Sequence, residues 1–94
     1  MDNIFALVDI SVEYSKIDGV IDSLSHLGCL EQIYEVTGEY DLKSIVSASG
    51  IEEFRDILRN RIMKINGVKG TRVQIMNLGN GFGKPALPPR NLGK

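Results

Sequence analysis

The sequence has 94 residues, of which 43% are hydrophobic and 24% are charged, and a formal net charge of −1. This length predicts one domain with a modest core, for which oligomerisation is a common way to cover the remaining apolar surface. The weak negative charge and a pI of about 5.7 argue against direct nucleic-acid binding, which normally needs a basic stripe. No apolar run approaches the ~20 residues of a membrane span, the start lacks the features of a secretory signal, and Cys29 is the single cysteine, so we expect a cytoplasmic protein.

Residues 3–12 predict a strand that is apolar on both faces. The first face carries Ile4, Ala6, Val8, Ile10 and Val12, and the second carries Phe5 and Leu7, followed by Asp9 and Ser11. A strand of this kind is buried on both sides, or it is covered on one side by something outside the domain. We therefore expect a central strand, with Phe5 and Leu7 at a subunit interface.

Two segments have the apolar spacing of amphipathic helices. The first helix is predicted to begin at Ser15, with Asp18 three residues later as in a capping box, and to end at Gly28. The second is predicted to begin with another Ser-x-x-Glu capping box at Ser49. Because each helix has a single apolar stripe, both are expected on the same face of one sheet.

Three further segments predict strands, at residues 30–37, 42–48 and 68–78. Charged residues interrupt the first of these, which suits an edge strand. The complete order is β-α-β-β-α-β, a ferredoxin-like α+β fold with an antiparallel sheet and two helices on one face. Right-handed crossovers place the strands at 3–12 and 42–48 in the middle of the sheet.

Residues 79–94 differ in composition from the rest of the chain, because they are rich in glycine and proline. Such a segment forms neither a regular helix nor an inner strand. We expect a C-terminal tail that packs on a neighbouring subunit or across its own sheet, with Phe82, Leu87 and Leu92 as apolar anchors.

The predicted turn between the second and third strands concentrates polar groups on a rigid support. Gly38 can take a left-handed backbone conformation, and the short carboxylate of Asp41 can bond nearby backbone amides. Two interpretations stay open from the residues alone. The turn is a strained connection in which Tyr40 packs and Asp41 caps amides, or it is an anchor for a small zwitterion, with backbone amides for a carboxylate and an aspartate for an ammonium group.

Little else in the sequence points to catalysis. His26 is better explained as a surface residue near a helix end than as a catalytic base, and Cys29 as a buried or half-buried structural residue than as a reactive thiol. Asp9 could be a buried base, but such a residue is more often paired with a lysine or arginine across the sheet or an interface. We predict no catalytic residue, no metal site and no cofactor.

The turn lies within a stretch that carries a family motif, Val36-Thr37-Gly38-Glu39-Tyr40-Asp41-Leu42. It resembles the V-x-G-x-Y-D-hydrophobic hairpin of the Lrp/AsnC regulators (leucine-responsive and asparagine-operon regulators). A second stretch, Gly67-Val68-Lys69-Gly70-Thr71-Arg72-Val73, resembles the G-V-x-x-T-x-T strand of the same family. The resemblance covers about residues 4–76 and matches the C-terminal effector domain, called the RAM domain (regulation of amino-acid metabolism). The chain is most similar to stand-alone RAM proteins, which lack the DNA-gripping helix-turn-helix.

The resemblance implies that residues 1–78 form a small-ligand-binding regulatory domain, with an amino acid as effector, and not an enzyme. Family members form dimers by packing sheet against sheet, and several dimers form a ring with effectors in the clefts between them. Gly38, Tyr40 and Asp41 match the motif at this cleft, and Ser49 matches by position at the start of the second helix. Mixing with full-length Lrp/AsnC regulators is the implied route to regulation of transcription, without direct contact to nucleic acid or membrane.

Two other functions stay open. Dimeric ferredoxin-like barrels include small monooxygenases and muconolactone-isomerase-like enzymes, and a pocket within one dimer lined by Asp9 or His26 would favour that alternative. The chain could also be a purely structural assembly partner whose ligand cleft is vestigial.

Overall fold

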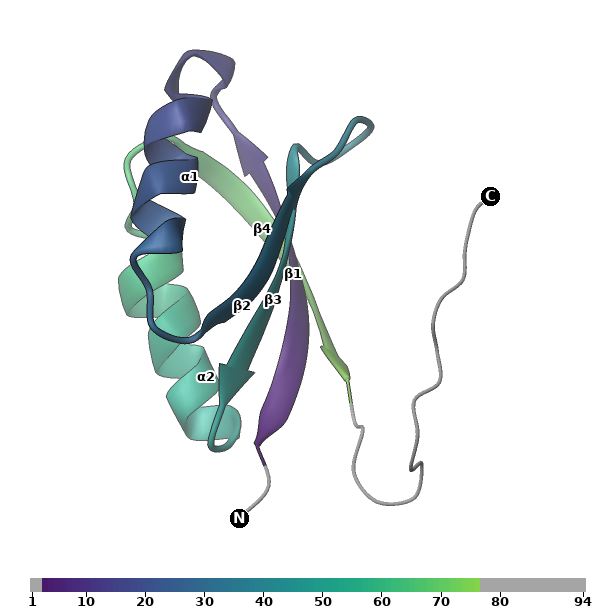
Figure 1. Ribbon diagram of the computed structural model, residues 1–94, viewed down its shortest axis with the longest axis vertical. Helices are drawn as coiled ribbons and strands as arrows, with labels where there is room; N and C mark the ends of the chain where they lie inside the picture. The colour runs from purple at the N-terminus through teal and green to yellow at the C-terminus, as the bar shows by residue number, and fades with distance from the viewer. Residues whose placement is uncertain (1–2, 77–94) are drawn as a thin grey trace.

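The computed structural model describes residues 3–76, which form one antiparallel sheet covered by helices on one face (Figure 1). In chain order the elements are β1 (Ile4–Val12), a 3₁₀ turn (Tyr14–Lys16), α1 (Ile17–Ser25), β2 (Leu30–Glu35), β3 (Leu42–Ala48), α2 (Ile51–Ile57), a π-helical continuation of α2 (Leu58–Ile62) and β4 (Val68–Met76). The strand order is β2-β3-β1-β4. The predicted ferredoxin-like α+β fold, with the first and third strands in the middle, is therefore confirmed. The predicted tail at 79–94 lies outside the described residues.

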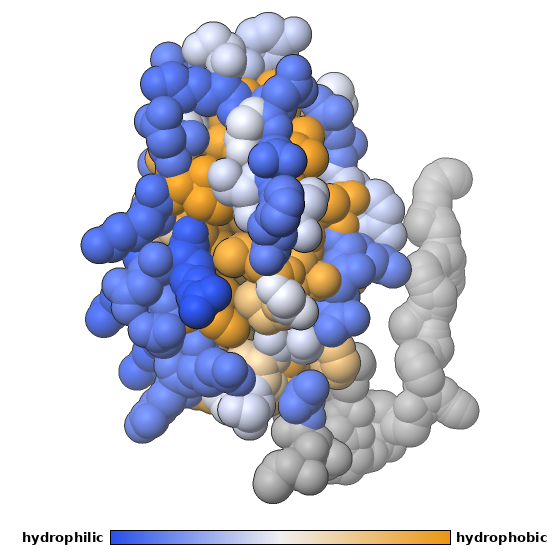
Figure 2. All heavy atoms as spheres, turned by 60° about the vertical axis from the view of Figure 1, so that its left-hand side comes forward, coloured by the Kyte–Doolittle hydropathy of each residue, from blue (hydrophilic) through white to orange (hydrophobic). Residues whose placement is uncertain are grey.

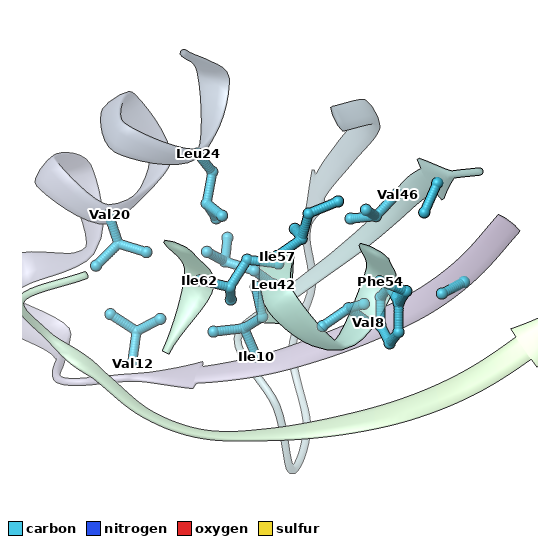
Figure 3. Packing of buried hydrophobic residues seen from close by; sticks show 12 residues of the cluster. Val8, Ile10, Val12, Val20, Leu24, Leu42, Val46, Phe54, Ile57 and Ile62 are labelled. Atoms are coloured by element: carbon cyan, nitrogen blue, oxygen red, sulfur yellow. The ribbon is translucent and has the colours of Figure 1, made fainter. Parts of the chain in front are cut away.

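The hydrophobic core lies between the helices and the inner face of the sheet. Its buried side chains come from β1 (Ala6, Val8, Ile10, Val12), β3 (Leu42, Val46, Ala48), α1 (Val20, Leu24) and α2 with its continuation (Phe54, Ile57, Ile62) (Figure 3). On the strands these residues alternate with period two, which is the geometry that sends every second side chain to one face. Ser44 shares this face, and its buried hydroxyl is satisfied because it donates to the carbonyl of Val8 at 3.0 Å.

The predicted caps of the first helix are wrong. The chain enters α1 through a 3₁₀ turn, closed by the N–H of Lys16 donating to the carbonyl of Glu13 at 2.8 Å, and Ser15 makes no capping bond. At the other end α1 stops at Ser25, before Gly28. Bonds of the i to i−3 type tighten that last turn, so it needs no left-handed glycine.

The second helix begins one residue later than the capping-box pattern indicates. Its N-cap is Gly50, so Glu53 rather than Glu52 holds the third helical position. The carboxylate of Glu53 reaches back and accepts the N–H of Ser49 at 2.6 Å. This resembles the acidic half of a capping box, except that Ser49 lies one residue before the N-cap. This hydrogen bond lowers the pKa of Glu53.

A π turn lets α2 bury two residues that an α-helix would separate. Ile57 and Ile62 are 6% and 0% exposed, although residues three or four apart, not five, share a face of an α-helix. The N–H of Met63 donates to the carbonyl of Leu58 at 2.9 Å, the i to i−5 bond of a π-helix. The wider turn brings both isoleucines to the core.

The outward surface of the domain is mixed in character. In Figure 2 hydrophilic residues cover much of the visible face, and hydrophobic residues appear in patches between them. Among residues 3–76, no helix combines the length and hydropathy needed to cross a membrane.

Two glycines give a matched test of this backbone. Gly67, in the turn directly before β4, has φ of 108°, and a Cβ there would stand 2.7 Å from the Cβ of Lys16. We expect Gly67→Ala to destabilise the domain by at least about 1–2 kcal/mol, from left-handed strain and this clash. Gly19→Ala, within α1 and with no heavy atom within 4 Å of the new Cβ, should instead stabilise it by about 0.5–1 kcal/mol. Urea unfolding of both variants checks the signs, and equal effects would contradict the assigned conformations.

Candidate functional site

A row of charged side chains crosses the sheet on the face away from the helices. Asp9 of β1 lies opposite Lys43 of β3 and Arg72 of β4 in the strand register. Its carboxylate is buried, with Asp9 7% exposed, and it accepts hydrogen bonds from Lys43 Nζ at Oδ1 and from Arg72 Nη2 at Oδ2, each at 3.0 Å. The prediction that Asp9 is paired with lysine or arginine across the sheet is confirmed.

The two cations decide the charge of this carboxylate. Burial by itself would raise the pKa of Asp9, because it penalises the charged form. The hydrogen bonds and charges of Lys43 and Arg72 outweigh burial and hold the pKa of the carboxyl below its ordinary value. The same contact raises the pKa of the Arg72 guanidinium. Asp9 therefore stays ionised at neutral pH and is a poor general base.

The hairpin loop between β2 and β3 is tied to the end of β1. The N–H of Asp41 donates to the carbonyl of Ile10 at 2.9 Å, and Asp41 Oδ2 accepts the N–H of Val12 at 2.8 Å. The N–H of Val36 donates to the carbonyl of Asp41 at 2.9 Å and closes the loop. Gly38 has φ of 128°, which residues with a Cβ rarely adopt. The loop is thus held in one conformation from both ends.

A cleft of about 330 Å³ opens where the charged row meets this loop. It is lined by Asp9, Val36, Thr37, Glu39, Tyr40, Lys43 and Arg72. Arg72 links the two parts, because its guanidinium carbon lies 4.7 Å from the centre of the Tyr40 ring and its Nη1 lies 3.8 Å from Glu39 Oε1. A smaller cleft of about 280 Å³ shares Asp9, Lys43 and Arg72 and continues along the sheet past Leu7.

The structure brings together three of the four predicted site residues. Gly38, Tyr40 and Asp41 share the hairpin loop, and Tyr40 lines the larger cleft. One carboxylate oxygen of Asp41 is used to anchor the loop, as in the structural interpretation of the turn. Ser49 lies at the opposite end of β3, next to Glu53 at the start of α2. Within one chain it is therefore remote from the hairpin.

Lys43 and Arg72 are cleft residues that sequence reasoning did not assign. Lys43 follows Leu42 and Arg72 precedes Val73, so each alone looks like a solvated residue on a strand of alternating polarity. The available signal was Asp9, an acid on an otherwise apolar strand that needs a cation on each neighbouring strand. Only the strand register identifies which cations these are.

The other candidates lie outside this cleft. His26 is exposed directly after the last residue of α1, with Nδ1 2.8 Å from the carbonyl oxygen of Asp22, as expected for a surface residue. Cys29 is half-buried, and burial raises the pKa of its thiol, which disfavours the reactive thiolate. Among the described residues, no three His, Cys, Asp or Glu side chains come together in the manner of a metal site.

The sequence matches a family model described as the Lrp/AsnC ligand binding domain, over residues 5–76. Those residues include all four strands and both helices of the structure, and well over half of the chain. The chain therefore belongs to the Lrp/AsnC ligand-binding domain family.

Relatives agree with this assignment. A helix-turn-helix-type transcriptional regulator of Pyrococcus furiosus is 27% identical over 73 residues, which are 78% of this chain and 49% of that regulator. The chain spans about half the length of the curated relatives it matches. A solved protein of Thermus thermophilus is 26% identical with a TM-score of 0.75, and the match covers 90% of this chain and 98% of that one. The feast or famine regulatory protein of M. tuberculosis, solved in complex with L-methionine, is 27% identical with a TM-score of 0.70, over 90% of this chain and 57% of that one.

The charged row predicts a specific response to acid. Because the pKa of Asp9 is lowered in the folded state, its contribution to stability is present above the unfolded pKa of about 3.9 and is lost as pH falls through the lowered folded value. We expect Asp9→Asn to flatten the loss of stability below about pH 4, measured as urea midpoints from pH 2 to 7. The control Glu35→Gln, at an exposed position at the end of the edge strand β2, should keep the wild-type acid response. Parallel pH curves for wild type and Asp9→Asn would contradict the assignment.

Proposed function

We propose that this domain is a regulatory module that binds a free amino acid at the β2–β3 hairpin and passes the signal on through its assembly with other subunits. The observation that carries the proposal is the cleft of about 330 Å³ beside the conformationally fixed hairpin, in a chain of a ligand-binding domain family. That volume lies at the low end for ligand sites and suits a small molecule. L-methionine bound to the M. tuberculosis relative supports an amino acid as the class of ligand.

The charges around the cleft also favour a zwitterion. Its lining residues include two cations, Lys43 and Arg72, and two acids, Asp9 and Glu39. A balanced lining of this kind can take a ligand with one carboxylate and one ammonium group without leaving net charge behind. A purely anionic ligand would pair only with the cations of the lining, and a purely apolar ligand would pair with neither the cations nor the acids.

Placement of the predicted residues supports a site shared between copies of the chain. Gly38, Tyr40 and Asp41 lie at one end of β3 and Ser49 beyond the other, and a seven-residue strand separates them by roughly 20 Å. A single small ligand touches both groups only if they come from different subunits. We therefore propose that the hairpin of one copy and the α2 start of another complete the crevice, in a ring of dimers.

The proposed dimer surface is the apolar part of the outer face of the sheet, on the side of the charged row away from the hairpin. Beside the charged row it carries Phe5, Leu7, Ile45 and Met76 from three strands, all partly exposed in the single chain. A second copy docking sheet to sheet would bury them, and an interface of identical chains of this kind is commonly two-fold symmetric. A ligand bound between subunits then shifts the assembly by its preference for one state. Full-length Lrp/AsnC regulators are the proposed partners on which this shift acts.

The same cleft gives less support to an enzyme. Asp9 lines it, as the barrel-enzyme alternative requires, but two cations hold it ionised with a lowered pKa. His26, the other candidate, is not among the lining residues. Calorimetry distinguishes a purely structural role from ligand binding, because a purely structural partner would bind no amino acid.

Isothermal calorimetry with the twenty standard amino acids tests the proposal. We expect at least one to bind, and Asp41→Ala to lower its affinity by about tenfold or more, because the loop loses the hydrogen bond that anchors it to the end of β1. Asp41→Asn separates the anchor from the charge of Asp41, since an amide oxygen can still accept the N–H of Val12 while the charge is lost. Absence of binding for all twenty, or wild-type affinity in Asp41→Ala, would refute the proposal.

Leu7→Lys tests the assembly. Leu7 sits centrally on the outer face, so a lysine there would bury an unpaired charge in a sheet-to-sheet dimer. We expect wild type to sediment as a dimer or a larger oligomer, and Leu7→Lys to shift toward monomer with unchanged far-UV circular dichroism. Tyr14→Lys, at a residue that is 85% exposed, is the control and should sediment like wild type. A wild-type chain that stays monomeric at tens of micromolar would argue against the shared crevice.

A further inference from the structure

The Arg72 guanidinium presents two different edges. Its Nε and Nη2 meet the buried carboxylate of Asp9, at 3.3 and 3.0 Å. Its Nη1 faces Glu39 across 3.8 Å, which is too long for a hydrogen bond. The side chains of Arg72 and Glu39 are 60% and 80% exposed, and exposed pairs of this kind are weak. Arg72 can therefore exchange the Glu39 contact while it keeps the Asp9 contact.

Two neighbouring side chains favour the binding of an anion at the Nη1 edge of the Arg72 guanidinium. Lys43, which lines the cleft, uses Nζ to bond Asp9 Oδ1, but an ammonium group has three donors, so two donors remain for another acceptor. The ring of Tyr40 lies against the guanidinium plane and fixes its orientation. The cleft thus has an oriented cationic wall, with the carboxylate of Glu39 as its exchangeable counter-charge.

Building on the amino-acid site proposed above, we propose that Arg72 and Lys43 receive the α-carboxylate of the ligand and that Glu39, released from Arg72, receives its α-ammonium. Binding replaces one long, solvent-exposed ion pair by two charge-assisted hydrogen-bonded pairs in a partly enclosed cleft. The guanidinium keeps its bonds to Asp9 throughout, so no buried charge loses its partner. The ligand class is an α-amino acid in which both groups are free.

Ligand analogues that each lack one group test this assignment. L-methionine, L-methioninamide and 4-(methylsulfanyl)butanoate share a side chain, but the amide has no carboxylate and the butanoate has no ammonium group. In calorimetry on the full wild-type chain, L-methionine should bind about tenfold or more tightly than either analogue. If L-methionine does not bind, the same series is built on whichever standard amino acid does.

Variants then connect each group to its residue. Arg72→Gln should lower affinity for the amino acid about ten- to hundredfold and leave that for the amide unchanged. Glu39→Gln should lower affinity for the amino acid and leave that for the butanoate unchanged. Arg59→Gln, at an exposed position of the π-helical continuation and away from the start of α2, should change none of the three. Arg72→Lys keeps a cation beside Asp9, so it replaces Arg72→Gln in the test if that variant does not fold. We expect it too to lower affinity for the amino acid and to leave affinity for the amide unchanged.

The outcomes separate this inference from the function on which it rests. Equal loss for all three ligands in the Arg72 variants, or a wild type that binds the amide as tightly as the amino acid, overturns the assignment of Arg72 while amino-acid binding stands. An absence of binding by any standard amino acid overturns both.

Discussion

Pairing of one buried carboxylate governs the geometry of this domain. Asp9 lies on the central strand and would be costly without partners, because a charge taken out of water must be compensated. Its direct cross-strand neighbours are Lys43 and Arg72, so both cations bond it only when β1, β3 and β4 are in their observed register. A slip of one residue would turn the cations to the helix side and leave Asp9 alone. The charged row thus disfavours a register slip at the part of the outer face that has the fewest apolar side chains to define the register.

The same register positions the hairpin. β3 begins next to the loop, and Asp41 binds both a carbonyl and an N–H near the end of β1. Arg72 adds a third attachment from β4, through its stacking on Tyr40. Three strands therefore converge on one loop, which explains how a segment with few buried side chains holds a cleft of defined shape. A loop supported in this way has little conformational entropy left to lose on binding a ligand.

Most of the fold was predictable because it depends on periodicity. The alternation in β1 and the single stripes of the two helices determine which faces meet, and these features are local in sequence. The helix ends were not predictable, because other bonds replace the expected serine caps: the N–H of Lys16 donates to the carbonyl of Glu13, and the carboxylate of Glu53 accepts the N–H of Ser49. The π turn could not be predicted either. Its only sign is a pair of buried isoleucines five residues apart, and their burial is known only from the structure.

The site was predictable only in part, for reasons of distance along the chain. The hairpin residues Gly38, Tyr40 and Asp41 are neighbours in sequence and form a recognisable motif, but Asp9 and Arg72 are 63 residues apart and meet through register. Asp41 illustrates the remaining ambiguity, because the same carboxylate that suits an ammonium group also suits the backbone N–H of Val12. Residue type determines what a side chain can bind, whereas topology determines what it meets.

The position of Arg72 has a consequence for how a ligand could be sensed. One guanidinium contacts the hairpin cleft through Tyr40 and Glu39 and the outer face of the sheet through Asp9. A ligand that changes the contacts of Arg72 on the first side changes the electrostatic surroundings of Asp9 on the second, a few ångströms away. Because linkage is reciprocal, whatever covers the outer face must then alter ligand affinity by the same factor. Coupling between ligand and assembly therefore needs no movement of the fold, only a redistribution of bonds around a single side chain.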